Sequence, residues 1–537
     1  MKTRFILTTL LLALLTTLNA AELKPAALFS DQMVLQRDKA VPIWGWADPG
    51  EQITVEFGGQ KKTTTAGADG KWMVKLDPLR TSAEPRELRI AAANHQSPVT
   101  VHDVLVGEVW LGSGQSNMAM SVNRAKDFEQ EQAAAKLPLI RMFKESSGAV
   151  ATPQEKCNGT WQVCSPETIG TFSATLYFFG RELHRELKVP VGLINSSVGG
   201  TPIESWVAGE AQAQSPELKV FHAEEAKADA SLDKAKKKAN YEKALALWKE
   251  RFAKAKKAGQ SPPRKPRDPQ EARSRKGGAG GLFNGKIAPL IPYALRGAVW
   301  YQGEANSRPG KGALYQYQLP LLVSDWRARW GEEFPFAWVQ LPNFKREGED
   351  WLLVREAMLK TLRLPHTGMA ITVDIGDPDN IHPKNKQEVG RRLSLWALGE
   401  VYDKKVASTS GPLPAGHKIN GSEVAITFQH ADGGLVVNSG GAMVTPREEW
   451  PSVWPEGGFG TIRGFAVAGA DKQWHRAAAK IVGNTVVVTS PEVKQPAAVR
   501  YAWETNPDCN LYNRAGLPAS PFRTDDWPVP AESAKTK

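Results

Sequence analysis

The sequence predicts an α/β protein in which a central domain with a parallel sheet is flanked by all-β regions. In the middle of the chain, short apolar runs such as VPVGLINSS precede loops and then helical stretches, which is typical of parallel strands with crossover helices. Towards both ends, apolar and polar residues alternate between turn sequences. The 537 residues, 41% hydrophobic and 23% charged, suffice for about three domains and exclude a disordered, collagenous or coiled-coil protein.

The first 20 residues have the pattern of a secretory signal peptide. Lys2 and Arg4 precede an apolar run from Phe5 to Leu18, and small residues follow at Ala20 and Ala21. This run is too short to span a bilayer, and no later segment has the ~18 consecutive apolar residues that a membrane helix needs. We therefore expect export to the periplasm or the outside, with no membrane insertion.

Both ends of the mature chain are predicted to form antiparallel β regions. In residues 21–105, apolar and polar side chains alternate from Ile53 to Phe57, and turn sequences such as GADGK separate the runs. In residues 402–530 the same alternation recurs from Val424 to Phe428, ahead of an ADGG turn. Residues 531–537 are expected to be a tail. The α/β domain then occupies residues 106–401.

The net charge of +11 is concentrated in one insertion, residues 218–277. Of the 68 Lys and Arg residues, 18 lie here, against 8 of the 57 Asp and Glu, so the rest of the chain is nearly neutral and no nucleic-acid partner is expected. Tyr241, Leu245, Trp248 and Phe252 recur at helical spacing, and a Pro/Arg/Gly-rich linker follows. We favour a solvated helical hairpin; binding of an acidic glycan is the alternative.

Four apolar runs of the middle region end in polar motifs. They are GSGQSNM at 112–118, SSVGGTPIESW at 196–206, YQGEANS at 301–307 and DIGDPDNIHPKNK at 374–386. Each alone is compatible with ordinary turn chemistry. In open α/β sheets, however, ligands bind at the carboxyl ends of the strands, so the combination predicts an active site there.

Ser116 is the candidate nucleophile. Small residues at 112–114 allow a sharp turn after the preceding strand, and Met118 and Met120 indicate the start of a packed helix. A serine at that position lies beside backbone N–H groups that favour a developing oxyanion. The alternative is a serine that only caps the helix.

With these motifs, the chain resembles the sialate O-acetylesterase family of the SGNH (GDSL-like) hydrolase superfamily. The resemblance includes the opening LFSDQMVLQRDKAVPIWGWADPGE, the segment GLFNGKIAPLIPYALRGAVWYQGEAN and the closing VRYAWETNPDCNLYNRAGLPASPFRTD, and it leaves out the 218–277 insertion. It implies a three-layer α/β/α domain and a secreted serine esterase that removes O-acetyl groups from sugars without a cofactor or metal.

The resemblance also assigns a triad. In the family GQSNM carries the catalytic serine, here Ser116, and the Asp-x-x-His motif falls on Asp379 and His382. His382 would take the serine proton and Asp379 would orient the imidazole. Local sequence alone leaves Asp374 and Asp377 open for the orienting role. A helix after the loop, with a stripe at Val389, Leu393 and Trp396, would anchor it.

The oxyanion donors are expected from three strand ends. The Ser116 amide is one, and Gly200, or Gly199 next to it, corresponds to the superfamily's second glycine. Superfamily members generally add an Asn from Gly-x-Asn, but here the Asn comes one place later, so Gln302 or Asn306 is expected to substitute.

The substrate of this site is expected to be an acetylated sugar or glycan. We expect Gln115, Asn117 and Glu304 to contact it, with Glu304 orienting a neighbour or a sugar hydroxyl because an ionised carboxylate only accepts hydrogen bonds. Acetylated xylan or another polysaccharide would suit the same triad as a sialate ester.

Two other classes compete with an esterase. One is a non-catalytic sugar-binding or adhesive protein in which the β domains bind the ligand, an idea that the Trp-rich loops fit. The other is a metal-dependent phosphoesterase or nuclease built on Asp374, Asp377, Asp379 and His382. The three cysteines make no zinc pattern, and the sequence leaves open whether Cys157 and Cys164 form a disulfide.

Overall fold

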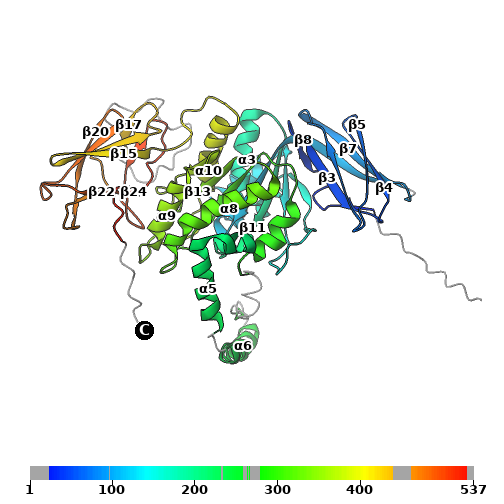
Figure 1. The fold of residues 1–537 in the computed structure, drawn as a ribbon, viewed down its shortest axis with the longest axis horizontal. Helices are drawn as coiled ribbons and strands as arrows, with labels where there is room; N and C mark the ends of the chain where they lie inside the picture. The colour runs from blue at the N-terminus through cyan, green and yellow to red at the C-terminus, as the bar shows by residue number, and fades with distance from the viewer. Residues whose placement is uncertain are drawn as a thin grey trace, which may run out of the picture.

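A computed structural model describes residues 23–95, 97–230, 234–257, 263, 265–266, 278–438 and 461–528. The expected signal peptide, most of the linker after α6 (Lys234–Lys257) and the tail lie outside the described residues. Figure 1 shows an elongated molecule with a central α/β body, a β region at each end, and a helical arm that projects from the body. The two β regions therefore do not share one sandwich.

The N-terminal region is all-β, as its alternating pattern predicts. Its strands are β1 (Lys24–Pro25), β2 (Val34–Gln36), β3 (Val41–Trp46), β4 (Gln52–Phe57), β5 (Gln60–Thr65), β6 (Lys71–Leu76), β7 (Ser82–Ala92) and β8 (Val99–Gly114). β1, β3 and β6 form one sheet, while β4 pairs with β5 and β7. Ile53, Val55 and Phe57 of β4 are buried. The long β8 pairs with β7 in its first half and continues into the central sheet, which joins the two regions.

The central sheet is parallel except at one edge. In the order β10-β9-β11-β8-β12-β13-β14, only β10 runs antiparallel to its neighbour. The bounds are β9 (Leu137–Lys144), β10 (Trp161–Cys164), β11 (Val191–Ser197), β12 (Gly297–Tyr301), β13 (Phe336–Val339) and β14 (Thr367–Ala370). The predicted α/β class is confirmed.

Helices cover both faces of this sheet. The α-helices of the body are α1 (Ser116–Ala119), α2 (Phe128–Ala134), α3 (Ala174–Leu187), α4 (Gly209–Gln214), α8 (Tyr315–Trp330), α9 (Asp350–Thr361) and α10 (Lys386–Trp396). Short 3-10 and π turns are η1 (Val122–Arg124), η2 (Ile169–Thr171), η3 (Ile203–Ser205), η4 (Phe283–Ile287), η5 (Ala288–Leu290), η6 (Gly312–Leu314) and η7 (Ala397–Val401). α3 and α10 pack in one hydrophobic core, and α8 and α9 in another. The result is a three-layer α/β/α domain.

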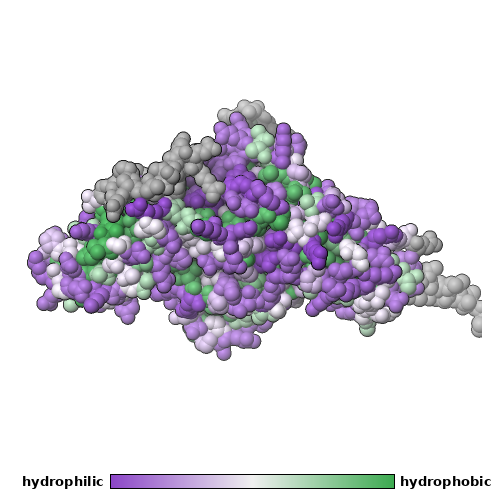
Figure 2. All heavy atoms as spheres, turned by 90° about the horizontal axis from the view of Figure 1, so that it is seen from above, coloured by the Kyte–Doolittle hydropathy of each residue, from purple (hydrophilic) through white to green (hydrophobic). Residues whose placement is uncertain are grey.

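The insertion forms the arm of Figure 1, built from α5 (Pro216–Ala230) and α6. The predicted apolar stripe lies on α6, where the Trp248 and Phe252 rings are 5.1 Å apart. Trp248 Nε1 donates to the Pro263 carbonyl at 2.8 Å, so the stripe contacts its own linker. In Figure 2 the surface seen from above is mostly hydrophilic. Val220, Leu247 and Phe252 of the arm are among the exposed large apolar side chains in the described part.

The C-terminal region consists of small antiparallel sheets. The strands are β15 (Leu413–Asn420), β16 (Glu423–Gln429), β17 (Leu435–Val437), β18 (Phe465–Ala468), β19 (Trp474–Arg476), β20 (Ala478–Val482), β21 (Thr485–Thr489), β22 (Ala498–Tyr501), β23 (Leu511–Asn513) and β24 (Phe522–Arg523). The sheets are β15-β16-β21-β20, β17-β23 and β19-β18-β22-β24. Cys157, Cys164 and Cys509 are all free thiols, and none of the described helices is long and apolar enough to cross a bilayer.

Candidate active site

A tight turn places Ser116 at the carboxyl end of the central strand. Gly114 ends β8 with φ +134°, and a Cβ there would lie 2.2 Å from the Tyr301 carbonyl oxygen at the end of β12. The Gln115 N–H donates to that same oxygen at 2.9 Å. Only glycine permits this approach. The chain then enters α1, where Met118 is buried as expected and Ser116 is half-buried.

The loop after β11 runs past the serine. A Cβ on Gly199 would lie 3.5 Å from the Ser116 Cβ, and the Val198 N–H donates to the Gly114 carbonyl at 3.0 Å. Gly200 is exposed with φ +72°, and among the described residues no acceptor is seen for its N–H. The Gly200 amide, one residue after the glycine that lies against Ser116, is therefore free to donate to a ligand.

The loop that carries His382 is bonded to the residue after the serine. Asn117 Nδ2 donates to the Ile381 carbonyl at 2.9 Å. Lys386 Nζ donates to Asn117 Oδ1 at 2.7 Å and to the Pro383 carbonyl at 2.8 Å. The backbone is thus held on both sides of His382 by groups linked to Asn117. The structure brings the Ser116 and His382 segments together at the carboxyl ends of the strands.

The His382 ring is half-buried in a positively charged surrounding. Burial lowers the pKa of His382 from its usual 6.5, and the charges of Lys386 and Arg124 lower it further. These effects all favour the neutral imidazole, which is the form that a general base needs.

The three aspartates of this loop have different surroundings. Asp374 is buried against the Arg392 guanidinium at 2.6 and 2.8 Å, and the Tyr512 hydroxyl also donates to it. Asp377 Oδ1 accepts the N–H of Asp379 at 3.0 Å and shapes the turn. The Asp379 carboxylate is exposed, 3.3 Å from Lys345 Nζ.

No hydrogen bond joins Asp379 to the His382 ring among the contacts of the described residues, so its orienting role stays a prediction. The carboxylates also do not converge with His382. Within the described ranges, the one grouping with metal-ligand proximity is Asp48, Glu51 and His95 in the N-terminal region. The loop therefore does not form the metal centre considered from the sequence.

The amides of Gln302 and Asn306 are buried and bonded to the protein. Gln302 Nε2 donates to the Thr201 carbonyl and to Asn306 Oδ1 at 3.1 and 2.7 Å. Asn306 Nδ2 donates to Glu204 at 2.9 Å and to Gln318 at 3.3 Å. These contacts use both N–H groups of each amide, so in this arrangement neither side chain has a donor left for an oxyanion.

The three residues expected to contact substrate are also buried. Gln115 Oε1 accepts the Ala305 N–H at 3.1 Å, and Asn117 Nδ2 donates to Glu304 Oε1 at 2.5 Å. In this geometry their side chains join the strand-end loops to one another. Sequence reasoning missed Lys386, because nothing local separates this buried lysine from the exposed Lys384 two residues earlier.

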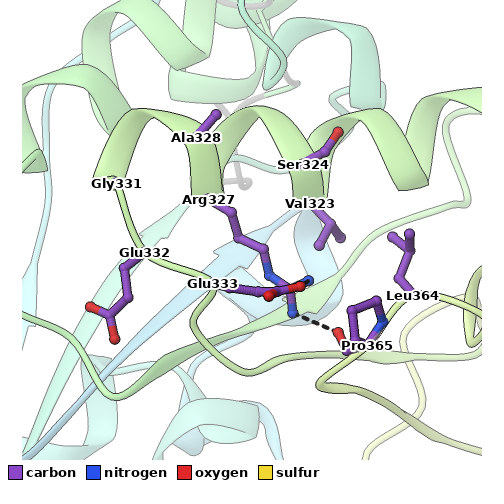
Figure 3. Close-up of a pocket in the computed structure, with 9 residues that line it drawn as sticks. All are labelled: Val323, Ser324, Arg327, Ala328, Gly331, Glu332, Glu333, Leu364 and Pro365. Atoms are coloured by element: carbon purple, nitrogen blue, oxygen red, sulfur yellow. Dashed lines mark hydrogen bonds and ion pairs between the residues drawn. The ribbon is translucent and has the colours of Figure 1, made fainter.

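A shallow hollow of about 440 Å³ lies elsewhere on the surface (Figure 3). It is lined by the C-terminal half of α8 and by Leu364 and Pro365, where the Arg327 guanidinium donates to the Pro365 carbonyl at 3.0 Å. These residues precede β14, whereas the His382 loop follows it. The hollow is therefore at the amino ends of the strands, away from Ser116.

Comparisons with known proteins identify carbohydrate esterases as relatives of this chain. A family model described as "Carbohydrate esterase, sialic acid-specific acetylesterase" matches residues 106–248 and 286–398, which include all four strand-end motifs. The chain is 28% identical to the sialate O-acetylesterase of Homo sapiens over 93% of the chain and 91% of that protein. It is 31% identical to that of Rattus norvegicus over 72% of the chain and 75% of that protein.

A solved structure is similar over nearly the whole chain. It is that of a carbohydrate acetylesterase from Xanthomonas citri, with a TM-score of 0.76 and 34% identity. The likeness covers 94% of this chain and 100% of that one, so it includes both β regions as well as the central domain.

Proposed function

Because the chain belongs to the sialic acid-specific acetylesterase family of carbohydrate esterases, we propose that it deacetylates sugars through an acetyl-enzyme on Ser116. The chain is a carboxylic ester hydrolase, and its family implies an acetylated sugar as substrate. The observation that carries the serine mechanism is the hydrogen bond from Asn117, next to Ser116, to the carbonyl of Ile381, next to His382.

In the first step the Ser116 hydroxyl attacks the acetyl carbonyl while His382 takes its proton. The carbonyl oxygen becomes an oxyanion that accepts hydrogen bonds from the Ser116 and Gly200 amides; losing one such donor costs about 3 kcal/mol. His382 then gives the proton to the sugar oxygen, and the sugar leaves as an alcohol. Asp379 would stabilise the imidazolium after moving from Lys345 towards the ring.

In the second step water hydrolyses the acetyl-enzyme. His382 takes a proton from the water, the hydroxide adds to the acetyl carbon, and the same amides receive the second oxyanion. Its collapse breaks the bond to Ser116 Oγ, which regains the proton from His382, and acetate leaves.

We propose an O-acetylated sialic acid as the sugar, on the strength of the family model and the named relatives. Acetate release from 9-O-acetyl sialic acid, compared with acetylated xylan at equal ester concentration, tests this. We expect a higher kcat/KM for the sialate ester; a higher value for xylan would favour the polysaccharide alternative, and no release from any acetylated sugar would overturn the proposed function.

Export is part of the proposal and is supported by the signal pattern of residues 1–20. N-terminal sequencing of the protein recovered outside the cytoplasm should begin close to residue 21. Recovery of the full-length chain from the cytoplasm alone would contradict export.

A further inference from the structure

Next to the predicted triad, the buried side chains of Glu304, Asn117 and Lys386 form a hydrogen-bonded network that the mechanism above does not use. Glu304 accepts from Asn117 at 2.5 Å, and Asn117 accepts from Lys386 Nζ at 2.7 Å. Asn117 and Lys386 are fully buried and Glu304 is nearly so. The three side chains come from α1, the loop after β12 and the start of α10. Their hydrogen bonds therefore connect three segments that follow strands of the central sheet.

Lys386 is the member that reaches the catalytic loop. Its ammonium donates to the Pro383 carbonyl, directly after His382, and its partner Asn117 donates to the Ile381 carbonyl, directly before His382. We propose that Lys386 is a positioning residue of the esterase, which holds the His382 segment against Ser116 through Asn117. This inference rests on the proposed function.

The electrostatics of the cluster agree with this role. The groups that face Lys386 are Glu304, Arg124, the His382 ring and the Tyr301 ring, whose centroid is 5.2 Å from Nζ. Burial lowers the pKa of Lys386 to about 7, although Glu304 opposes this shift, and burial raises the pKa of Glu304. The Lys386 charge in turn lowers the pKa of His382.

Burying the Lys386 amine costs free energy, because its charged form loses contact with water. Replacing buried ionic groups by apolar side chains of similar size is often neutral or stabilising, so packing alone does not account for a lysine here. The three hydrogen-bond donors of the ammonium do account for it, because they join Asn117 and the backbone after His382 with one group.

The test compares Lys386→Met with the matched variant Lys384→Met. Both remove a lysine after His382, but Lys384 lies in the loop before α10 and is exposed. For Lys386→Met we expect kcat to fall at least about tenfold with KM changed less than twofold, and the acid limb of kcat/KM to move up by roughly 0.5 to 1 pH unit as the pKa of His382 rises. Lys384→Met should match wild type in kcat, in KM and in the position of the acid limb.

A second variant separates position from charge and serves if Lys386→Met does not fold. Asn117→Ala breaks the link to the Ile381 carbonyl but keeps the lysine, so kcat should fall at least about tenfold with the acid limb unmoved. Thermal unfolding checks that both variants fold. If every folded variant stays within twofold of Lys384→Met with the same acid limb, the positioning role is wrong.

Ser116→Ala in the same assay distinguishes the two levels of inference. If Ser116→Ala is inactive while Lys386→Met and Asn117→Ala behave as Lys384→Met, the serine mechanism stands and the positioning role fails. If Ser116→Ala keeps its activity, the proposed mechanism fails, and the inference about Lys386 fails with it.

Discussion

At the scale of single residues, the site depends on the hydroxyl of Ser116, which the tight turn at Gly114 places at the end of β8. Ser116→Ala should lower kcat at least about 1,000-fold, because loss of a serine nucleophile removes the whole covalent route. The half-buried side chain loses only one oxygen, so the melting temperature should barely change. Hydrolysis of a chromogenic acetyl ester and labelling by a fluorophosphonate probe measure this, with Ser121→Ala as control. Full labelling of Ser116→Ala would refute the assignment.

His382 sets the pH dependence. The pKa of His382 is lowered from 6.5, first by burial and then by Lys386 and Arg124, so the imidazole stays neutral to a lower pH than an ordinary histidine. Activity should therefore be lost as the pH falls through this lowered pKa.

A kcat/KM profile with pH, measured for wild type and Arg124→Gln, checks this dependence. Removal of the exposed Arg124 charge should raise the pKa of His382 and move the acid limb to higher pH. His382→Ala should have no measurable acid limb, because activity is abolished. If the midpoint of the wild-type acid limb lay above pH 6.5, the lowered pKa of His382 would be contradicted.

At the scale of elements, the C-terminal region braces the catalytic loop. Arg355 of α9 is buried and donates to the carbonyls of Leu341, Pro342, Glu504 and Thr505. Burial lowers the pKa of Arg355 to about 9. The loop after β13, held in this way, contacts the His382 loop, because Asn343 Oδ1 accepts the Gly376 N–H at 2.7 Å.

Substitution of Asn343 tests this contact between the C-terminal region and the His382 loop. Its Nδ2 also donates to Asn506 of the C-terminal region at 3.0 Å. Asn343→Ala should lower the free energy of unfolding by about 1 to 3 kcal/mol and reduce kcat, because the Gly376 N–H loses its acceptor. Denaturant unfolding and ester hydrolysis measure the two effects, with Asn123→Ala, at an exposed position of η1, as control. Unchanged kcat would mean that the C-terminal region does not influence the catalytic loop.

At the scale of the whole molecule, the arm is a separate unit attached to the body. α6 contacts its own linker through Trp248, whereas the start of α5 is fixed to the body by His222 and Gln212, 2.8 Å apart. We expect that replacing residues 226–276 by a flexible linker of about 12 residues leaves hydrolysis of a small acetyl ester within twofold of wild type.

Loss of activity on a small ester after this replacement would show that the arm supports the site. Loss confined to acetylated acidic polymers would favour the alternative that the basic arm binds an acidic glycan. Acetate release from both kinds of substrate distinguishes these outcomes.

The sequence by itself determined the fold class, the candidate serine and the family resemblance. These depend on local patterns: alternation in strands, helical spacing, glycines at tight turns and short motifs at strand ends. Ser116 and His382 could be named in this way because each lies in a compact motif.

Only the tertiary structure decided what each polar side chain bonds. Asn117 meets Lys386 across 269 positions of the chain, the N–H groups of Gln302 and Asn306 are used inside the protein, and Asp379 faces Lys345. Local sequence fixes backbone conformation and which face is buried, but the partner of a buried polar group comes from a distant segment, and its position depends on how the whole sheet is assembled.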